Sequence, residues 1–540
     1  MLPYPEPASP VVSKHAKMKA RLSLLSVLLS LVGRAVSFSA SPPPPSSSRS
    51  SGPGHEGNEG TNRRLRKPTR KESIAFTARV KRARSGRDAI RVLIDIEEED
   101  RCQTDVFQYS AAISKCARDK LVDKALGLLK RMINQGVAPD AAIFCAVIDA
   151  CAKAGQYKSA ISLLNDMEDK FGVEPNVKCF SAAISACEKA AKWEEAVKLL
   201  RKMPELGVEP NAFSYNSVIS ACEKCAEWEK ALEFLDEMEE VGIQPNDYSY
   251  NSAISACEKA AKWEEAVKLL RTMPKKGVVP DVYSYNSVIS ACEKCAEWER
   301  ALEFLDEMAE VGISPNVRSY SAAISACEKG RKADIALSLL AQMKKEGVQP
   351  NVVAYSSTIS ACEKGGTKYT DTALSLFTEM KNAGVNPNDV TYTAITQACV
   401  DSNRYLEALE LAREAKGKGI CRIKISMENG LPKWDLHDLS EAMACMLLAD
   451  ALQSLVHSSN EGTSPDYQDI IIVTGKGLNT WDPNGPVLRA KVPAFLNDVA
   501  GLETTAIEGN GGRFLITAAS LEKWVASGAY EKFRGIFQED

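Results

Sequence analysis

The stretch Tyr215–Met238, YNSVISACEKCAEWEKALEFLDEM, returns with few changes at Tyr250–Met273 as YNSAISACEKAAKWEEAVKLLRTM and at Tyr320–Met343 as YSAAISACEKGRKADIALSLLAQM. Around it, a unit of about 35 residues recurs nine times between Val106 and Ile420. A fixed period of this size is typical of a solenoid, in which stacked units bury apolar faces that no unit can bury alone. Such arrays present a long surface, so we expect a binding protein.

One unit, Ala212–Asn246, predicts a hairpin of two helices, with Ser214 as a candidate N-cap of the first helix. The apolar residues of the first helix have helical spacing: Val218, Ile219 and Cys222. Those of the second helix form one stripe: Trp228, Ala231, Leu232, Leu235 and Met238. A break is expected near Ala226, and Gly242 followed by Pro245 ends the second helix. The sequence therefore predicts an all-α solenoid of about nine hairpins over residues 106–420.

The composition bounds the rest of the chain. Its 540 residues are too many for one core, so we expect two or more units with tails. The net charge of −4 does not by itself indicate a polyanionic partner, although residues 63–91 hold twelve Lys and Arg against two acidic residues.

The cysteines indicate packing more than cross-linking. Nine of the sixteen occupy one position of successive repeats: Cys116, Cys151, Cys187, Cys222, Cys257, Cys292, Cys327, Cys362 and Cys399. A small apolar residue that recurs once per unit is typical of a core. We therefore expect reduced thiols in a reducing compartment.

The N-terminus has the features of a targeting segment. Lys14, Lys17, Lys19 and Arg21 precede an apolar run over residues 22–32, which is too short to span a bilayer as a mature helix. Phe38 and a Ser/Pro/Arg-rich stretch follow. Residues 1–38 resemble the signal part of the bipartite leader of algae with secondary plastids, which implies a plastid (chloroplast); a mitochondrion and secretion are the alternatives. Residues 39–100 are predicted to be a transit-peptide-like, disordered basic segment.

The repeats resemble pentatricopeptide repeats. The features are the period of 35, an aromatic residue followed by Asn or Ser at positions 4 and 5, and a closing Pro-Asn or Pro-Asp, where Ala212 is position 1 and Asn246 is position 35. Tetratricopeptide repeats, which mainly bind peptides, share the hairpin. The resemblance is to the P class of pentatricopeptide-repeat proteins, and it implies binding of single-stranded RNA. In that family, positions 5 and 35 of each repeat read one base, and position 2 packs on the base.

The side chains imply a base for most repeats. Asp at position 35 only accepts hydrogen bonds and favours the ring N–H of uracil or guanine, whereas Asn can also donate and suits adenine or cytosine. Ser or Thr at position 5 leaves room for a purine, and Asn suits a pyrimidine. The pairs are Ser110 with Asp140, Cys145 with Asn176, Ser181 with Asn211, Asn216 with Asn246, Asn251 with Asp281, Asn286 with Asn316, Ser321 with Asn351 and Ser356 with Asn388, and the ninth repeat offers Thr393 alone. The implied target, from the 5′ end, is G-N-A-Y-U-Y-A-A, where Y is a pyrimidine and N any base.

Aromatic residues at position 2 are the candidates for packing on bases: Phe107, Phe213, Tyr248 and Tyr283. Stacking of this kind contributes about 1–3 kcal/mol per base. Packing between repeats is the alternative role for these side chains.

An internal duplication favours such a code. Ala183–Arg201 is identical to Ala253–Arg271, and the differences between these two repeats lie at their edges, where Ser181 corresponds to Asn251. The scaffold is unchanged while a reading position differs. Repeats four and six differ at five positions but keep the same Asn/Asn pair, so they add no support.

After Ile420 the periodicity stops, and a small α/β sandwich is predicted over residues 421–518, with a helical tail over 519–540. The expected strands cover residues 422–426, 434–439, 469–474, 504–508 and 512–517, and the expected helices cover 440–457 and 487–498.

Two motifs of this region resemble the Smr (MutS2-related) domain. They are Trp434-Asp435-Leu436-His437, like its Leu-Asp-x-His element, and Thr474-Gly475-Lys476-Gly477, like its Thr-Gly-x-Gly loop. Asp435 and His437 are two apart on a predicted strand, so they point to one face, where they can hold a metal ion or activate water against a phosphodiester. The loop can cradle a phosphate with its N–H groups. The resemblance leaves open whether this domain is a metal-dependent RNA endonuclease, using Mg²⁺ or another divalent ion, or only binds RNA.

Together these features predict sequence-selective binding of single-stranded RNA in an organelle, in RNA processing, stability or translation. No membrane partner is expected for the mature form. The alternative is a helical-repeat scaffold that binds proteins without RNA specificity.

Overall fold

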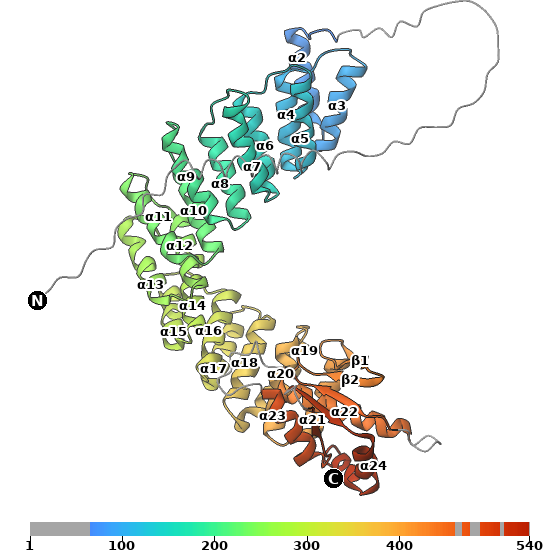
Figure 1. Ribbon diagram of the computed structural model, residues 1–540. Coiled ribbons are helices and arrows are strands. Elements are labelled where there is room, and N and C mark those ends of the chain that lie inside the picture. Colours follow the sequence, from blue (N-terminus) through green and yellow to red (C-terminus); the bar gives the residue numbers. More distant parts are fainter. Residues whose placement is uncertain (1–64, 460–466, 476–486, 508–511, 539–540) are drawn as a thin grey trace, which may run out of the picture. The chain divides into compact units, whose positions relative to one another are not determined.

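The computed structural model of the chain describes residues 65–459, 467–475, 487–507 and 512–538 (Figure 1). The predicted leader over residues 1–38, the part of the basic segment before Leu65, and Lys476 and Gly477 lie outside the described residues. Within the described ranges, no helix is both long enough and apolar enough to cross a membrane.

Within the described residues, nine helical hairpins occupy the predicted repeats, which confirms the predicted solenoid. Figure 1 shows their helices side by side along the chain. The first helices are α4 Val106–Arg118, α6 Ala141–Lys153, α8 Val177–Lys189, α10 Ala212–Lys224, α12 Asp247–Lys259, α14 Val282–Lys294, α16 Val317–Lys329, α18 Val352–Lys364 and α20 Asp389–Asp401. The second helices are α5 Val122–Asn134, α7 Tyr157–Asp169, α9 Trp193–Glu205, α11 Trp228–Glu240, α13 Trp263–Thr272, α15 Trp298–Glu310, α17 Ala333–Lys345, α19 Thr370–Asn382 and α21 Tyr405–Gly417. Two 3-10 turns, η1 Pro274–Lys276 and η2 Thr367–Tyr369, follow α13 and precede α19.

The turns lie where the sequence predicts them. Ala226, between α10 and α11, has a left-handed backbone with φ of 58°, and Gly242 after α11 has φ of 81°. The predicted N-cap was wrong, because Asn211 and not Ser214 caps α10, and its side chain accepts a hydrogen bond from the Ser214 amide at 3.0 Å. A cap needs extended backbone, which Asn211 has, whereas Ser214 is the third residue of the helix.

This cap recurs throughout the array. The position-35 residue caps the first helix of the next repeat in each case: Asp140, Asn176, Asn211, Asn246, Asp281, Asn316, Asn351 and Asn388. The residue that the sequence singles out for base reading is therefore also part of the scaffold, since its side chain orders the helix that follows.

The first helices stack on one another from repeat to repeat, and all hairpins share one continuous apolar core. The nine cysteines that recur at one position are free and at most 1% exposed, which confirms their packing role. Burial raises the pKa of the Cys257 thiol to about 12. Such thiols stay protonated, and hence poorly reactive, near neutral pH.

Residues 65–100 correct the sequence prediction, because they are ordered instead of disordered. Thr69 caps α2 (Arg70–Arg82) in a capping box with Glu72, and Ser85 caps α3 (Gly86–Glu98). Both helices pack against α4. Gly86 allows the approach, since a Cβ atom there would lie 2.9 Å from the Cα of Cys116.

Beyond α21 the chain forms a five-stranded sheet. Its strands are β1 Lys424–Glu428, β2 Leu431–Asp435, β3 Ile470–Val473, β4 Thr505–Ala506 and β5 Arg513–Ile516, in the order β1-β2-β3-β5-β4. β2 and β3 are parallel and the other neighbours are antiparallel. The second strand was predicted over 434–439 but ends at Asp435, because the Leu439 amide donates to the Leu436 carbonyl at 2.9 Å and turns the chain.

Helices complete this C-terminal region and join it to the solenoid. They are α22 Glu441–Ser459, α23 Val487–Ala494, the π-helix η3 Phe495–Val499, α24 Ala518–Ala526 and α25 Ala529–Gly535. The segment predicted as a tail belongs to the fold, since the Trp524 indole donates to the Ala500 carbonyl at 2.6 Å. Asp450 of α22 accepts hydrogen bonds from Arg413 and Lys416 of α21, both at 2.7 Å. Burial opposes ionisation of Asp450, but these two cations outweigh it and lower the pKa of the carboxyl.

Candidate nucleic-acid interface

The predicted reading residues meet between successive first helices. We call each meeting point a slot, numbered by repeat: it consists of the position-5 residue, the position-35 residue, and the position-3 residue of the next repeat. Slot five holds Asn251, Asp281 and Ser284. The Asn251 amide nitrogen donates to Asp281 Oδ1 at 3.2 Å, and the Ser284 hydroxyl donates to Asn251 Oδ1 at 2.6 Å. The structure thus brings together the predicted pair and adds a third residue that the sequence analysis missed.

The two oxygens of the Asp281 carboxylate differ in their contacts. Oδ1 accepts the amides of Tyr283 and Ser284, at 2.9 and 3.0 Å, which caps α14. Among the described residues, every hydrogen bond to this carboxylate goes to Oδ1. Oδ2 is therefore free to accept a hydrogen bond from a ligand.

Slots four and six repeat this geometry with Asn in place of Asp. In slot four, Asn216 donates to Asn246 Oδ1 at 3.3 Å and accepts from the Ser249 hydroxyl at 2.6 Å. Slot six has the same contacts at 3.4 and 2.5 Å, between Asn286 and Asn316 and between Ser319 and Asn286. Both contacts fix the orientation of the position-5 amide, because its oxygen and its nitrogen each have a partner.

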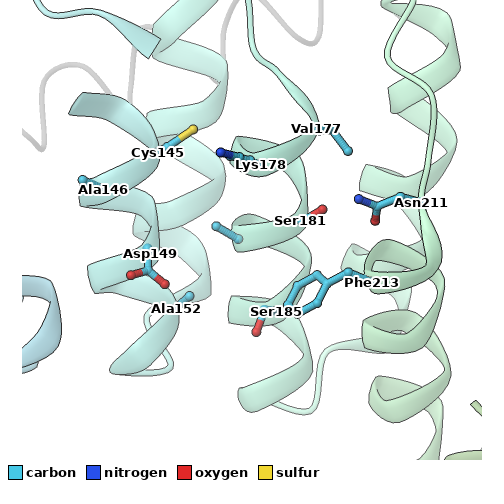
Figure 2. Close-up of a pocket in the computed structure, with 11 residues that line it drawn as sticks. Cys145, Ala146, Asp149, Ala152, Val177, Lys178, Ser181, Ser185, Asn211 and Phe213 are labelled. Carbon is cyan, nitrogen blue, oxygen red and sulfur yellow. The ribbon is translucent and has the colours of Figure 1, made fainter. Parts of the chain in front are cut away.

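Slots three, seven and eight carry a hydroxyl at position 5. The Ser321 hydroxyl donates to Asn351 Oδ1 at 3.1 Å. Ser356 lies 3.4 Å from Asn388 Oδ1 and 2.6 Å from the Thr391 hydroxyl. In slot three, the Ser181 hydroxyl lies 3.0 Å from the Ser214 hydroxyl, and Figure 2 shows it pointing toward Asn211. A serine leaves more free space beside the cap than an asparagine does.

Slot two differs from all of these, because a disulfide joins Cys145 at position 5 to Cys179 at position 3 of the next repeat, with their Cα atoms 4.7 Å apart. The prediction that the thiols are reduced was therefore wrong for this pair. Asn176 still caps α8 through the amides of Lys178 and Cys179. In slot one, the next position 3 is the apolar Ile143, and Ser110 and Asp140 share no hydrogen bond within the described ranges. Within the described residues, no further hairpin follows repeat nine, so Thr393 has no position-35 cap as a partner.

Exposed aromatic side chains flank the slots. Phe107, Phe213, Tyr248 and Tyr283 are 65%, 56%, 49% and 63% exposed, so packing between repeats does not account for them. Tyr248 and Tyr283 both line a pocket of about 590 Å³, together with Asn251 and Asp281 of slot five. Phe213, with Ser181 and Asn211, lines a pocket of about 440 Å³ at slot three (Figure 2). These pockets are of a size and chemistry that suit a flat ring with hydrogen-bonding edges.

A row of ion pairs, which the sequence analysis missed, runs beside the slots. Each pair joins Glu at position 12 to Lys at position 13 of the next repeat: Glu188 with Lys224, Glu223 with Lys259, Glu258 with Lys294, Glu293 with Lys329 and Glu328 with Lys364. The Glu-Lys dipeptide that recurs at positions 12 and 13 was the sequence feature that could have predicted these ion pairs. The lysine side chains are 34–39% exposed, so each pair is worth at most about 1 kcal/mol and the ammonium groups stay accessible to phosphates.

The C-terminal region holds a second polar cluster. Asp435 is the last residue of β2, and His437 lies in the turn after it. His437 Nδ1 is 2.5 Å from Asp435 Oδ1, and its Nε2 is 3.0 Å from Asp438, a neighbour that the sequence analysis missed. A hydrogen bond from Lys424 lowers the pKa of the Asp438 carboxyl. Gly475, in the turn after β3, has φ of 84° and approaches closely, since a Cβ atom there would lie 3.1 Å from His437 Cβ.

The contacts of this cluster bear on the predicted metal and phosphate roles. Within the described ranges, no group of three or more His, Cys, Asp or Glu residues is arranged to hold a metal ion. One oxygen of Asp435 and one of Asp438 contact the imidazole, and Lys424 donates to the other oxygen of Asp438. Thr474 is buried and its hydroxyl donates to the Gly512 carbonyl at 3.2 Å, so it supports the loop and does not face a ligand.

Several solved structures match this chain in a structural comparison. Pentatricopeptide repeat protein PPR10 from maize is 19% identical, with 86% of this chain and 70% of that chain covered and a TM-score of 0.48. PPR10 in complex with an 18-nt psaJ RNA element is 21% identical, and the match covers 86% of this chain and 66% of that chain with a TM-score of 0.36. Yeast Rmd9p in complex with 16nt target RNA is 10% identical, and the match covers 86% of this chain and 94% of that chain with a TM-score of 0.33. No curated protein matches the sequence.

A family model matches the solenoid itself. The model describes the pentacotripeptide-repeat region of PRORP, and it matches residues 96–264, 213–369 and 318–422. Together these matches run without a gap from residue 96 to residue 422, which is more than half of the 540 residues. The chain therefore belongs to the family of pentatricopeptide-repeat proteins.

Proposed function

We propose that this protein binds single-stranded RNA with sequence selectivity, one base per slot. The observation that carries the proposal is the repeated slot geometry: a position-5 side chain held against the cap of the next helix, beside an exposed ring at position 2. Hydrogen-bonding edges at a regular spacing, flanked by aromatic faces, suit unstacked bases of a single strand. Family membership supports the same ligand.

The contacts of slot five support uracil in particular. Asn251 is fixed by Ser284, and Asp281 keeps Oδ2 as an acceptor for the N3–H of the base. Slots four and six, where Asn replaces the acid, suit a pyrimidine, and the serine slots suit adenine. The proposed target is G-N-A-Y-U-Y-A-A, with no preference at slot two, where the cysteine pair stands.

A binding assay tests this proposal directly. The full chain is incubated with labelled RNA that contains GNAYUYAA and with a base-shuffled control of equal composition, at fixed salt because phosphate contacts make affinity salt-dependent. Selective retention of the first RNA is the expected result. Equal retention of both RNAs would contradict the code and favour the alternative of a scaffold for protein partners.

For the C-terminal region we propose an Smr-type domain that grips or cuts RNA near the bound segment, in RNA processing, stability or translation. The exposed His437, held between Asp435 and Asp438, favours a cutting role, because a histidine with carboxylate partners can move a proton to or from a phosphodiester oxygen. In the same assay, His437→Ala should abolish fragments and leave RNA retention unchanged. Absence of fragments with the unmodified chain would leave the domain with a binding role alone.

We place this activity in a plastid, with a mitochondrion as the alternative. The support is the sequence of the leader, in which a basic stretch and an apolar run precede Phe38. Fusion of residues 1–100 to a fluorescent protein tests the proposal. Signal outside both organelles would contradict it.

A further inference from the structure

We propose that α2 and α4 frame a ninth base-reading slot, which takes a guanine directly 5′ of the base at slot one. We call it slot zero; it consists of Ser73, Asp105 and Gln108. The inference rests on the proposed RNA binding. It concerns residues 65–100, which were predicted to be disordered, and Asp105 and Gln108, which no base-reading prediction included.

The contacts of slot zero match those of the recognised slots. The Ser73 hydroxyl donates to Asp105, the cap of α4, as Ser321 donates to Asn351 in slot seven. Gln108, at position 3 of repeat one, donates to the Ser73 hydroxyl at 3.3 Å. Ser73 and Asp105 are 32 residues apart, the same separation as Ser356 and Asn388 in slot eight.

A pocket of about 480 Å³ lies beside this slot, and Ser73 is the slot residue that lines it, together with Arg70 and Phe107. Arg70 stands three residues before Ser73, as Tyr248 stands three before Asn251, and Phe107 takes the place of Tyr283. A base in this pocket can therefore lie between a guanidinium plane and an aromatic ring, both of which stack on bases. Phe107 is 65% exposed, in the same range as Phe213, Tyr248 and Tyr283, so the ring is open to contact with a base.

The charges fit a nucleotide. Lys81 lines the same pocket and stands eight residues after Ser73, which matches the position-13 lysines: Lys259 stands eight after Asn251. Lys259 is paired with Glu223, whereas no ion pair in the described ranges involves Lys81 or Arg70. Both cations are thus available to a phosphate, and a phosphate contact needs no rearrangement of existing pairs.

The hydrogen-bonding groups select the base. Asp105 offers only acceptors, which suit the N1–H and amino group of guanine, and the small Ser73 leaves room for a purine. Asp105 Oδ1 caps α4 through the amides of Phe107 and Gln108, at 2.9 and 3.3 Å. Oδ2 receives the Ser73 hydroxyl and keeps a second lone pair for the base. The extended target reads G-G-N-A-Y-U-Y-A-A.

The test uses the full chain and four nine-nucleotide RNAs that differ only in the first base, before G-A-A-C-U-C-A-A. Fluorescence anisotropy should give roughly tenfold tighter binding for guanine than for the other bases. Asp105→Asn keeps a residue that caps helices well and should move the preference to adenine. The matched control is Asp140→Asn in slot one, which should change the preference at the second base only.

Two results would overturn the inference, and they separate it from the proposed function. Equal affinity for the four RNAs, with selectivity retained for the bases at slots one and five, would remove slot zero and leave the eight-base code in place. Equal affinity whichever base is changed would remove both. The first comparison needs no variant, so it does not depend on how well a substituted chain folds.

Discussion

Slots four to six and slot two are built on the same backbone and differ in how position 5 meets position 3 of the next repeat. In slots four to six a serine hydroxyl donates to an asparagine oxygen, at 2.5–2.6 Å. In slot two a covalent bond joins Cys145 and Cys179 in the same places. The hydrogen-bonded slots keep a polar amide at position 5, whereas the bonded sulfurs have no hydrogen to donate.

The difference indicates that position 3 acts as a positioning residue for position 5. A hydroxyl there holds the asparagine amide in one orientation by donating to its oxygen, and a cysteine there locks a cysteine partner. An apolar residue there supplies no such contact, so position 5 keeps at most the cap as its partner, as Ser321 does beside Ala354 in slot seven. Two side chains per repeat therefore describe the slot incompletely, and the third decides how firmly the first is held.

The largest effect is expected from exchanging the chemistry of slot five. Asn251→Ser with Asp281→Asn converts its residues to those of slot three, so the preferred fifth base should change from uracil to adenine. The combined change in relative binding free energy should be about 2–3 kcal/mol, because an acceptor and a donor are both replaced. Competition binding with RNAs that differ only at the fifth base measures it.

Asp281→Asn alone is the matched control for that exchange. It gives the Asn/Asn pair of slots four and six, so uracil and cytosine should bind about equally, and the preference for a pyrimidine should remain. An unchanged uracil preference in both variants would show that the slot does not read the base.

A change in the scaffold should act on all slots alike. A Cβ atom at Gly330 would lie 2.5 Å from Cδ1 of Trp298, so Gly330→Ala overpacks the junction between repeats six and seven. We expect a loss of about 1–3 kcal/mol in the free energy of unfolding, with base preferences unchanged. Thermal denaturation measures the loss. Gly127→Ala in α5 is the control, since nothing lies within 4 Å of its added Cβ, and it should stabilise the helix by about 0.5–1 kcal/mol.

Slot two can be converted into slot four. Cys145→Asn with Cys179→Ser supplies the amide and the hydroxyl of slot four, so the second base should acquire a pyrimidine preference of about 1.4 kcal/mol, or tenfold. The unmodified chain, with and without a phosphine reductant, serves as the control and should remain nearly indifferent to this base. A variant that stays indifferent would show that these three side chains do not determine the preference.

The sequence was sufficient to predict the features that recur in every repeat. It was insufficient to predict the structure at the ends of the array. Cys222 and its equivalents recur because every repeat has neighbours on both sides, so the hairpins and their core were predictable. α2 has a neighbour on one side only, buries few residues such as Phe76 and Val80, and exposes its basic face, which resembles a leader. Caps and cross-repeat contacts depend on distances between residues about 33 apart, which a linear pattern does not reveal. Asp438 was missed for the same reason, since the turn after β2 directs it at His437.

The smallest effect is expected from removing the positioning hydroxyl alone. In Ser284→Ala the Asn251 oxygen loses its donor, so the amide can rotate and the uracil preference at the fifth base should fall by about 0.5–1.5 kcal/mol. Alanine is compatible with this position, because Ala354 occupies it in slot seven and α18 is still capped by Asn351. Competition binding at the fifth base measures the loss, and the sixth base in the same RNA is the internal control. An equal loss at both bases would assign Ser284 to the stability of α14, whereas a loss confined to the fifth base would make position 3 a third member of the reading set.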